Sequence, residues 1–277
     1  MVETGSDVTE VAKGDSVLLS YAFCNACSQC TSGHPPYCEN LLGLNFGGHR
    51  SDGTSTLKSA DGSKLHGHFF GQSSFSRLAI VNRYSLVKVP NDVPLSILAP
   101  LGCGVQTGAG AILNTLDVQP GSTVAIFGVG SVGLSAVMAS KSRGAQQIIA
   151  VDVQSSRLKL AREVGATATI NSSDTDVIAE LKRLCPPLGV QYALDCSGVP
   201  KVVETMIESL GLRGRACSVG APPPDKQASV NIFSHLVMGR QYLGCHQGES
   251  IARKVGQRPA FRTEHPLTMA KPRCFLT

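Results

Sequence analysis

Along the second half of the chain, short apolar runs alternate with longer segments in which apolar residues recur at helical spacing. Apolar runs of four to six residues are typical of parallel strands buried on both faces. Their alternation with helices predicts an α/β fold with a doubly wound parallel sheet. The expected strands are 123–127, 147–151, 167–170, 192–195, 216–219 and 241–245, and the expected helices are 132–142, 155–164, 176–184 and 200–210.

The first hundred residues follow a different pattern. Short candidate strands at 16–22, 77–81 and 86–89 flank a Gly- and Ser-rich stretch, 43–71, which is typical of a loop or hairpin. From Ile251 onward neither helical nor strand periodicity remains, and three prolines break any helix. We therefore predict a partial β-rich lobe at 1–104, a sheet domain at 105–248 and an atypical basic tail at 249–277.

Composition and charge narrow the function classes. Of the 277 residues, 42% are hydrophobic and 16% are charged, which excludes a mainly disordered chain. The net charge of +5 resides in residues 251–277, which carry six basic residues and one acidic residue. The other 250 residues have 19 of each sign, so we expect no nucleic-acid partner.

Two features bear on location. The 23 residues from Val118 to Ser140 carry no charge, but Pro120 and four glycines divide them into a turn, a buried strand and a helix start rather than a membrane span. Residues 1–12 carry three acidic residues and lack the apolar core of a signal peptide, so the ten cysteines favour a reduced compartment in which some bind metal. We expect a cytoplasmic protein with no membrane partner.

Four cysteines form the first candidate site: Cys24, Cys27, Cys30 and Cys38, with the spacing C-x2-C-x2-C-x7-C. Four thiolates on one loop can surround zinc tetrahedrally and leave no open coordination position, so the predicted site is structural. An iron–sulfur cluster is the rival, although in ferredoxins the fourth cysteine of such a run follows three residues later and precedes proline. Disulfides or incidental thiols are the remaining alternative.

A glycine-rich turn forms the second candidate site. The motif is Gly128-Val129-Gly130-Ser131-Val132-Gly133. It follows a predicted strand and opens a predicted helix, where its three glycines would make a tight turn, admit a pyrophosphate and let the helix pack closely. Asp152, 19 residues after Gly133, would accept hydrogen bonds from the adenosine ribose and repel a 2′-phosphate, which favours NAD over NADP. The alternative is a packing turn beside a surface acid.

Cys103 is the third candidate. It lies in the Gly-rich apolar stretch 100–108, between the β-rich lobe and the sheet domain. Such junctions commonly hold small-molecule sites, whereas a lone cysteine is more often a small buried apolar side chain. The residues alone leave both possibilities open.

Together these motifs resemble the medium-chain zinc-dependent alcohol dehydrogenases, most closely their aryl-alcohol dehydrogenase-like branch. The resemblance covers about Val2–Ser250 and includes, in order, Gly-Asp-x-Val at 14–17, the four-cysteine loop, segment 70–76 and Gly-Cys-Gly-x-x-Thr-Gly at 102–108. It implies a GroES-like zinc lobe beside the Rossmann domain. It also implies zinc and NAD as cofactors, and hydride transfer between NAD and a primary alcohol, aryl or allylic, which becomes the aldehyde.

The resemblance assigns roles to further residues. Thr107 matches a residue near the nicotinamide, and Arg157 a basic residue on the adenosine side. Val219 matches the segment that binds the carboxamide. Phe69 and Phe70 match positions that line the substrate channel, with ordinary core aromatics as the alternative.

In this family a catalytic zinc has three protein ligands, of which Cys103 matches one. The family's other two ligands, and its proton relay, precede the position that Met1 occupies, so we expect weak or no dehydrogenase activity from the chain as written. Of the seven histidines, His68 and His246 are candidates near the cleft, and residues 251–277 resemble a frameshifted or alternatively spliced end.

Two other function classes remain open. One is a non-catalytic NAD(H)-binding protein with a structural zinc, and the other is an iron–sulfur electron carrier. The family commonly forms dimers or tetramers through the edge strand of the sheet, here expected at Gln241–Cys245. A homo-oligomer is therefore expected, because an exposed sheet edge needs covering.

Overall fold

The computed structural model describes residues 1–55, 57–72 and 76–255. The described chain divides into two compact units. Unit 1 comprises Met1–Cys103 together with the described residues from Ile251 onward, and unit 2 comprises Gly104–Ser250.

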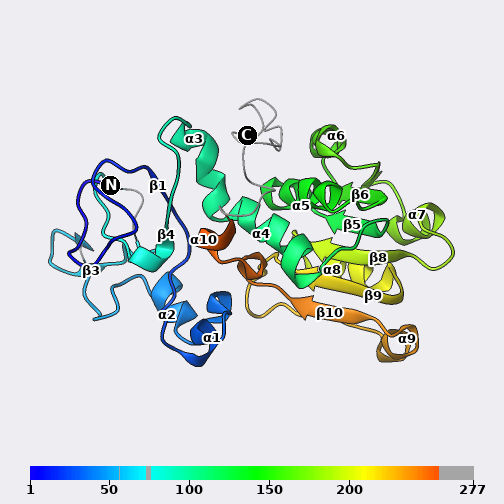
Figure 1. The fold of residues 1–277 in the computed structure, drawn as a ribbon. Helices are drawn as coiled ribbons and strands as arrows, with labels where there is room; N and C mark the ends of the chain where they lie inside the picture. Colours follow the sequence, from blue (N-terminus) through cyan, green and yellow to red (C-terminus); the bar gives the residue numbers. More distant parts are fainter. Residues whose placement is uncertain (56, 73–75, 256–277) are drawn as a thin grey trace. The chain divides into compact units, whose positions relative to one another are not determined.

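Unit 2 is built on a six-stranded sheet with the order β10-β9-β8-β5-β6-β7, in which all neighbours are parallel (Figure 1). The central strand β5 (Thr123–Phe127) is buried from Val124 to Phe127, as expected of a strand covered on both faces. The strand order reverses between β5 and β8, because β6 and β7 follow β5 on one side and β8 begins the other. The remaining strands are β6 (Gln147–Asp152), β7 (Ala168–Asn171), β8 (Val190–Asp195), β9 (Leu210–Ser218) and β10 (Gln241–Gly244).

A helix follows each of the first five strands of this sheet. These helices are α5 (Ser131–Ser142), α6 (Ser155–Val164), α7 (Val177–Leu184), α8 (Pro200–Glu208) and α9 (Ile232–Met238). Before the sheet, helix α4 (Gly104–Gly110) continues directly into a short π-helix, η4 (Ala111–Thr115). Gly108 lets α4 approach α5 closely, because a Cβ there would lie 1.9 Å from the carbonyl oxygen of Val132. Between strands and helices lies an apolar core that includes Phe127, Leu181 and Met206.

Unit 1 is less regular. Strand β1 (Val17–Leu19) pairs with β4 (Leu86–Lys88), and β2 (Leu57–Lys58) with β3 (Lys64–Leu65), both antiparallel. The short helices and turns are α1 (Ser28–Thr31), η1 (Pro35–Tyr37), α2 (Leu41–Phe46), η2 (Arg83–Ser85), α3 (Leu95–Leu98), η3 (Ala99–Gly102) and α10 (Ala252–Val255).

Buried hydrogen bonds, ion pairs and a cation–π contact connect the segments of unit 1. The buried Asn45 accepts a hydrogen bond from Ala22 N and donates to Ala22 O, both at 2.8 Å. On α10, Arg253 Nη1 lies 3.3 Å from Glu10 Oε1, and the guanidinium lies 5.8 Å from the centre of the Tyr84 ring. Unit 1 thus relies on specific polar contacts more than on an extended core.

The sheet of unit 2 confirms the predicted strands and helices, with the largest shift at β9, which begins six residues early. In unit 1 the strand predicted at 16–22 is confirmed but spans only Val17–Leu19. Two predictions there are wrong, and the first is the strand at 77–81, where no strand forms. Leu78 and Ile80 in that segment are 71% and 77% exposed, so its apolar residues do not face a core. The second error is the helix Ala252–Val255, in a segment expected to be irregular.

Helices α4 and α9 were not predicted. In α4, four glycines within 102–110 favoured an irregular stretch, and burial of the helix within unit 2 overrides that weak propensity. The rest of the predicted tail, 256–277, lies outside the described residues.

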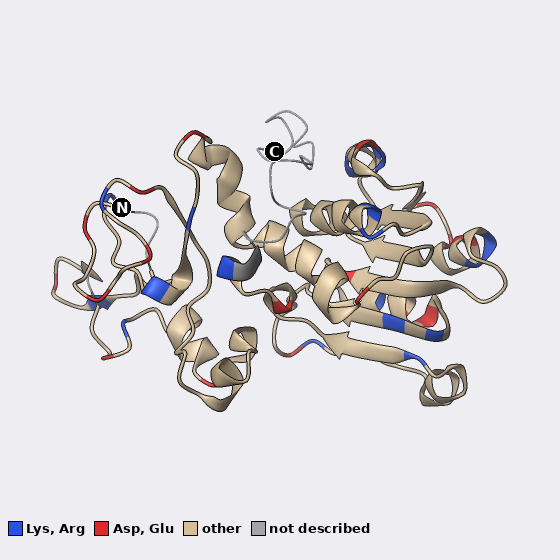
Figure 2. Cartoon of the chain, in the orientation of Figure 1, with Lys and Arg blue, Asp and Glu red and all other residues tan. Residues whose placement is uncertain are grey.

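The uncharged run 118–140 folds as predicted into a turn, strand β5 and the start of α5. Over the described residues no single helix has the length and apolarity to cross a membrane; the bent pair Leu95–Gly102 and Gly104–Thr115 passes that test on length and composition alone. Figure 2 shows acidic and basic residues interspersed over the ribbon of each unit rather than gathered on one element.

Candidate functional site

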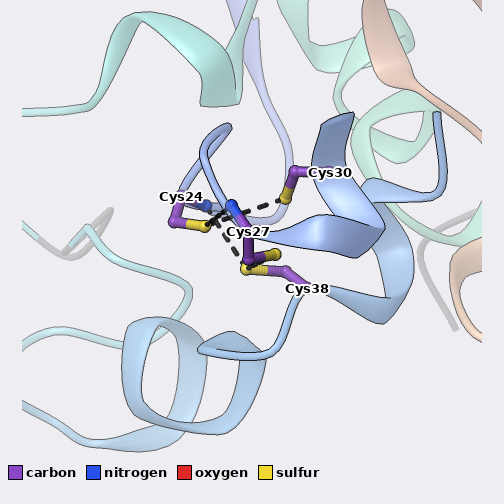
Figure 3. A group of neighbouring side chains, drawn as sticks. All are labelled: Cys24, Cys27, Cys30 and Cys38. Carbon is purple, nitrogen blue, oxygen red and sulfur yellow. Dashed lines mark hydrogen bonds between the residues drawn. The ribbon is translucent and has the colours of Figure 1, made fainter. Parts of the chain in front are cut away.

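The four predicted cysteines converge in unit 1 (Figure 3). Their sulfur atoms all lie within 4.8 Å of one another, with 3.9 Å between Cys24 and Cys30 and 4.0 Å between Cys27 and Cys38. Four thiolates at a zinc–sulfur distance of about 2.3 Å stand about 3.8 Å apart at the corners of a tetrahedron. The observed spacing therefore fits one zinc ion.

The same spacing argues against the alternatives. The four cysteines of the cluster are not joined by disulfides, and a disulfide would bring two sulfurs to about 2.05 Å. A four-iron cluster holds each thiolate on a separate iron, and so farther apart than one shared ion does. The geometry thus favours a closed, structural zinc site.

The surroundings shift the pKa values of these thiols in opposite directions. The amides of Ala26 and Cys27 donate to Cys24 Sγ at 3.5 and 3.3 Å and lower the pKa of Cys24 to about 6. Burial instead raises the pKa of Cys30 to about 12. Because metal-bound cysteines are deprotonated, a cation is needed to hold all four as thiolates together.

The glycine-rich turn joins β5 to α5 in unit 2. Gly128 adopts φ +84°, a left-handed conformation that favours glycine. A Cβ on Gly133 would lie 2.1 Å from Gly128 O, whereas a Cβ on Gly130 would meet nothing within 4 Å. Gly130 caps the twelve-residue helix α5 without a side-chain bond, so the first N–H groups of the helix are not occupied by a cap. This open, electropositive turn fits a phosphate group.

Asp152 ends β6 beside that turn. Its Oδ2 accepts a hydrogen bond from Val129 N and its Oδ1 from Gln154 N, each at 2.8 Å. Arg157 Nη1 lies 3.8 Å from Asp152 Oδ2 and is half exposed. The carboxylate therefore fixes the turn and marks the adenosine side of the predicted cofactor site.

Val219 and Thr107 are the remaining predicted cofactor residues of unit 2. Val219 follows β9 and donates its N–H to Asp195 O at 2.9 Å. Thr107, buried on α4, donates its hydroxyl to Gln247 Oε1 at 3.4 Å. Gln247 belongs to η5 (Gln247–Glu249), which follows β10. Sequence reasoning missed Gln247, since no motif or spacing marks it.

Cys103 lines a cavity within unit 1 of about 660 Å³. Gly102, its neighbour, is held against β1: Ser20 Oγ donates to Gly102 O at 2.7 Å, and a Cβ on Gly102 would lie 2.2 Å from Leu19 O. The exposed Cys103 shares the cavity with His68, one of the two histidines singled out from the sequence.

Three phenylalanines line the same cavity. The rings of Phe46, Phe69 and Phe70 pack edge to face, with centroids 4.7 to 5.9 Å apart. Phe69 is 68% exposed, which does not fit an ordinary core aromatic. Residues 73–75 of the matching sequence segment lie outside the described residues.

Comparison with protein families finds two matches. Residues 1–91 match the alcohol dehydrogenase GroES-like domain, and residues 131–258 match the zinc-binding dehydrogenase family. The two matches fall on the β-rich lobe and the sheet domain.

Similar proteins include a probable alcohol dehydrogenase of Pseudomonas sp, 37% identical over 89% of this chain and 78% of the relative. A geraniol dehydrogenase of Castellaniella defragrans is 40% identical over 84% of this chain and 62% of its own length. This chain thus spans between three fifths and four fifths of these relatives.

Two solved structures share the fold. A Burkholderia ambifaria alcohol dehydrogenase zinc-binding domain protein has a TM-score of 0.87 at 44% identity, covering 92% of this chain and 68% of that one. The benzyl alcohol dehydrogenase of Acinetobacter calcoaceticus has a TM-score of 0.86 at 40% identity, covering 96% and 72%.

Proposed function

Because this chain belongs to the zinc-dependent alcohol dehydrogenase family, we propose that it takes part in reversible hydride transfer between NAD and a primary aryl or allylic alcohol. The observation that carries the proposal is the strand–turn–helix of unit 2, with Gly130 facing open space and Asp152 at the end of the next strand. When bound, NAD supplies the chemistry by accepting hydride.

In this proposal the chain's own residues bind and orient the cofactor. The N–H groups at the start of α5 hold the pyrophosphate, which the absence of a side chain at Gly130 lets approach. Asp152 accepts hydrogen bonds from the adenosine ribose, and its charge disfavours a 2′-phosphate. Arg157 lies at the adenosine side, and Val132 and Gly133 hold α5 close to its neighbours.

The proposed substrate class follows from the cavity in unit 1. Phe69 and Phe70 present aromatic surface to a space of about 660 Å³, large enough for an aryl or allylic alcohol. Flat apolar groups gain from edge-to-face contact with such rings, whereas short aliphatic alcohols bury little area there. Benzyl alcohol and geraniol dehydrogenases among the similar proteins are consistent with this choice.

A second candidate function is NAD(H) binding without catalysis, together with the structural zinc. A catalytic zinc needs three protein ligands. Among the described residues, the four-cysteine cluster is the one group of three or more candidate metal ligands. Cys103 is therefore a single candidate ligand, and the described residues do not by themselves form a catalytic zinc site.

We also propose that the chain self-associates through α9 and β10. Strand β10 ends the sheet, and the neighbouring α9 exposes Ile232, Phe233 and Leu236, each more than 70% exposed. An apolar surface beside an open strand edge is costly in water. A second copy presenting the same surface would cover both.

A binding titration and an activity assay test the proposed function. NADH and NADPH are titrated into the protein by fluorescence, and reduction of NAD is followed at 340 nm with benzyl alcohol, geraniol and ethanol. Preferential NADH binding with oxidation of the first two alcohols is expected of the enzyme. NADH binding without any oxidation favours the second candidate, and no binding of either nucleotide refutes both.

Asp152→Asn is the matched variant for cofactor choice. It keeps an oxygen acceptor for Val129 N while removing the negative charge. The ratio of NADPH to NADH affinity should rise in this variant. An unchanged ratio would remove Asp152 as the determinant.

A further inference from the structure

Three cysteines that the proposed function does not use lie at the carboxyl ends of the neighbouring strands β8, β9 and β10 (Figure 1). Cys196 follows β8, Cys217 lies near the end of β9 and Cys245 follows β10. The register pairs Cys217 with Leu194 on β8 and with Leu243 on β10. Because Cys196 and Cys245 each lie two positions beyond these partners, all three side chains belong to one face of the sheet.

Two of these cysteines are in direct contact. The Cys217 thiol donates a hydrogen bond to the Cys245 sulfur. Thr115 Oγ1, at the end of η4, donates a second hydrogen bond to the same sulfur at 3.0 Å. Cys245 N donates to Ser218 O at 3.1 Å, so the bonding between β9 and β10 continues past the last residue of β10. The sheet therefore holds the two sulfur atoms beside each other.

The surroundings give the two thiols different reactivity. The hydrogen bonds from Cys217 and Thr115 lower the pKa of Cys245, against the opposing effects of burial and of the Glu249 carboxylate. The hydrogen bond to Cys245, together with burial, holds the pKa of Cys217 well above its usual value. In cysteine chemistry the thiolate is the nucleophile. Cys245 is therefore the nucleophile of the pair, and Cys217 keeps its proton.

Burial limits which reagents can reach the pair. Cys217 is 0% exposed and Cys245 is 7% exposed, so the nucleophile is the more accessible of the two. A bulky disulfide or alkylating agent needs an open thiol, whereas hydrogen peroxide is little larger than water. Buried cysteines that serve only as small apolar side chains are inert toward it. Reaction with peroxide in the folded protein therefore separates a redox site from ordinary packing.

We propose that Cys217 and Cys245 form a dithiol site that hydrogen peroxide oxidises to a disulfide. The Cys245 thiolate attacks one peroxide oxygen, the O–O bond breaks, and hydroxide leaves to become water with the proton that Cys245 has lost. The sulfur of Cys217 then attacks the sulfenic acid on Cys245, the S–O bond breaks, and a second water leaves with the Cys217 proton. Each sulfur loses one electron, and peroxide is reduced to two water molecules.

This site does not depend on the proposed function, since no step uses a nucleotide or an alcohol. A dithiol reductant reverses the oxidation by thiol–disulfide exchange.

Peptide mapping reads the product directly. Trypsin places Cys217 in residues 216–226 and Cys245 in residues 241–253, and neither peptide contains another cysteine. The full chain, loaded with zinc, is treated with hydrogen peroxide, unfolded, alkylated and digested. The two peptides should appear joined, about 2 Da lighter than their sum because two hydrogens are lost. Dithiothreitol should separate them and restore both thiols.

Four variants assign the roles. Cys217→Ser should leave Cys245 carrying one or two added oxygen atoms, since no second thiol condenses with its sulfenic acid. Cys245→Ser should leave Cys217 unmodified. Thr115→Val keeps the shape but removes the hydroxyl donor, so oxidation of Cys245 should slow about 3- to 10-fold. Cys185→Ser is the matched control, because its buried thiol lies outside the pair, and it should form the link at the original rate.

Recovery of both peptides unlinked and alkylated, from protein that stays folded by circular dichroism, would overturn the proposal. A link from either peptide to residues 184–201, which hold Cys185 and Cys196, would also overturn it. So would a link found only between two chains, seen as a doubled mass on a non-reducing gel. Should a serine variant not fold, the peptide map of the original protein decides alone.

Discussion

The glycine-rich turn can be tested by adding one methyl group at each of two positions. The methyl should weaken ligand binding at one position and lower the stability of the fold at the other. Gly130→Ala and Gly133→Ala make the same chemical change three residues apart. A Cβ at 130 would meet no atom of the protein within 4 Å, whereas a Cβ at 133 would lie 2.1 Å from Gly128 O. The first variant should therefore affect the ligand and the second the fold.

The magnitudes follow from these distances. Ordinary contact begins at 3.4 Å, so Gly133→Ala requires a displacement of 1.3 Å between α5 and the turn. Overpacking of this kind costs about 1–3 kcal/mol, which lowers Tm by about 3–10 °C in a domain of this size. Gly130 has φ −71°, which alanine adopts without strain, so Gly130→Ala should leave Tm unchanged or raise it by about 1–3 °C.

The assay measures thermal unfolding and NADH affinity for both variants side by side. Gly130→Ala should raise the Kd for NADH at least about tenfold, since its methyl occupies the space through which a pyrophosphate approaches. A destabilised Gly130→Ala, or one that binds NADH with unchanged affinity, would refute the assignment of this turn to a phosphate.

Metal analysis should find one zinc per chain, lost in Cys30→Ser but retained in Cys185→Ser, whose buried thiol lies outside the cluster; zinc retention in Cys30→Ser would contradict the site. Hydrogen bonding to Arg83 lowers the pKa of Glu10 to about 2, from a usual value of 4.5. Its stabilising effect should be complete above pH 4.5 and disappear as the pH falls toward 2, so the urea midpoints of the original protein and Glu10→Gln should converge over that range. Phe233→Glu on α9 should lower the molar mass measured by sedimentation if that surface covers a second copy, and an unchanged mass would refute that interface.

The sequence predicted the sheet of unit 2 well because its strands are buried on both faces. A strand such as β5 must be continuously apolar, and that pattern is visible without a structure. Unit 1 was predicted poorly, since its strands are two or three residues long and its segments are held by single polar residues. The apolar residues Leu78 and Ile80 suggested a strand, yet both are exposed.

Site residues show the same division. Cysteines at fixed spacing and glycines between a strand and a helix carry their chemistry in the sequence itself, because neighbours along the chain form the site. Gln247 accepts a hydrogen bond from Thr107, 140 positions away, and Asn45 joins segments that no periodicity connects. Such residues become visible only when the fold brings their partners together.

The shortage of apolar core in unit 1 gives the zinc site its physical significance. Buried apolar side chains are concentrated in unit 2, whereas the described residues of unit 1 contribute few, among them Tyr21, Leu86 and the cluster residues Cys30 and Cys38. In zinc-finger peptides, structural zinc contributes about 10–16 kcal/mol, as much as the whole stability of a typical domain, about 5–15 kcal/mol. A unit with so small a core therefore depends on its metal, while the sheet of unit 2 has a core of its own. Chelation should consequently unfold unit 1 first and leave the NADH-binding turn of unit 2 in place.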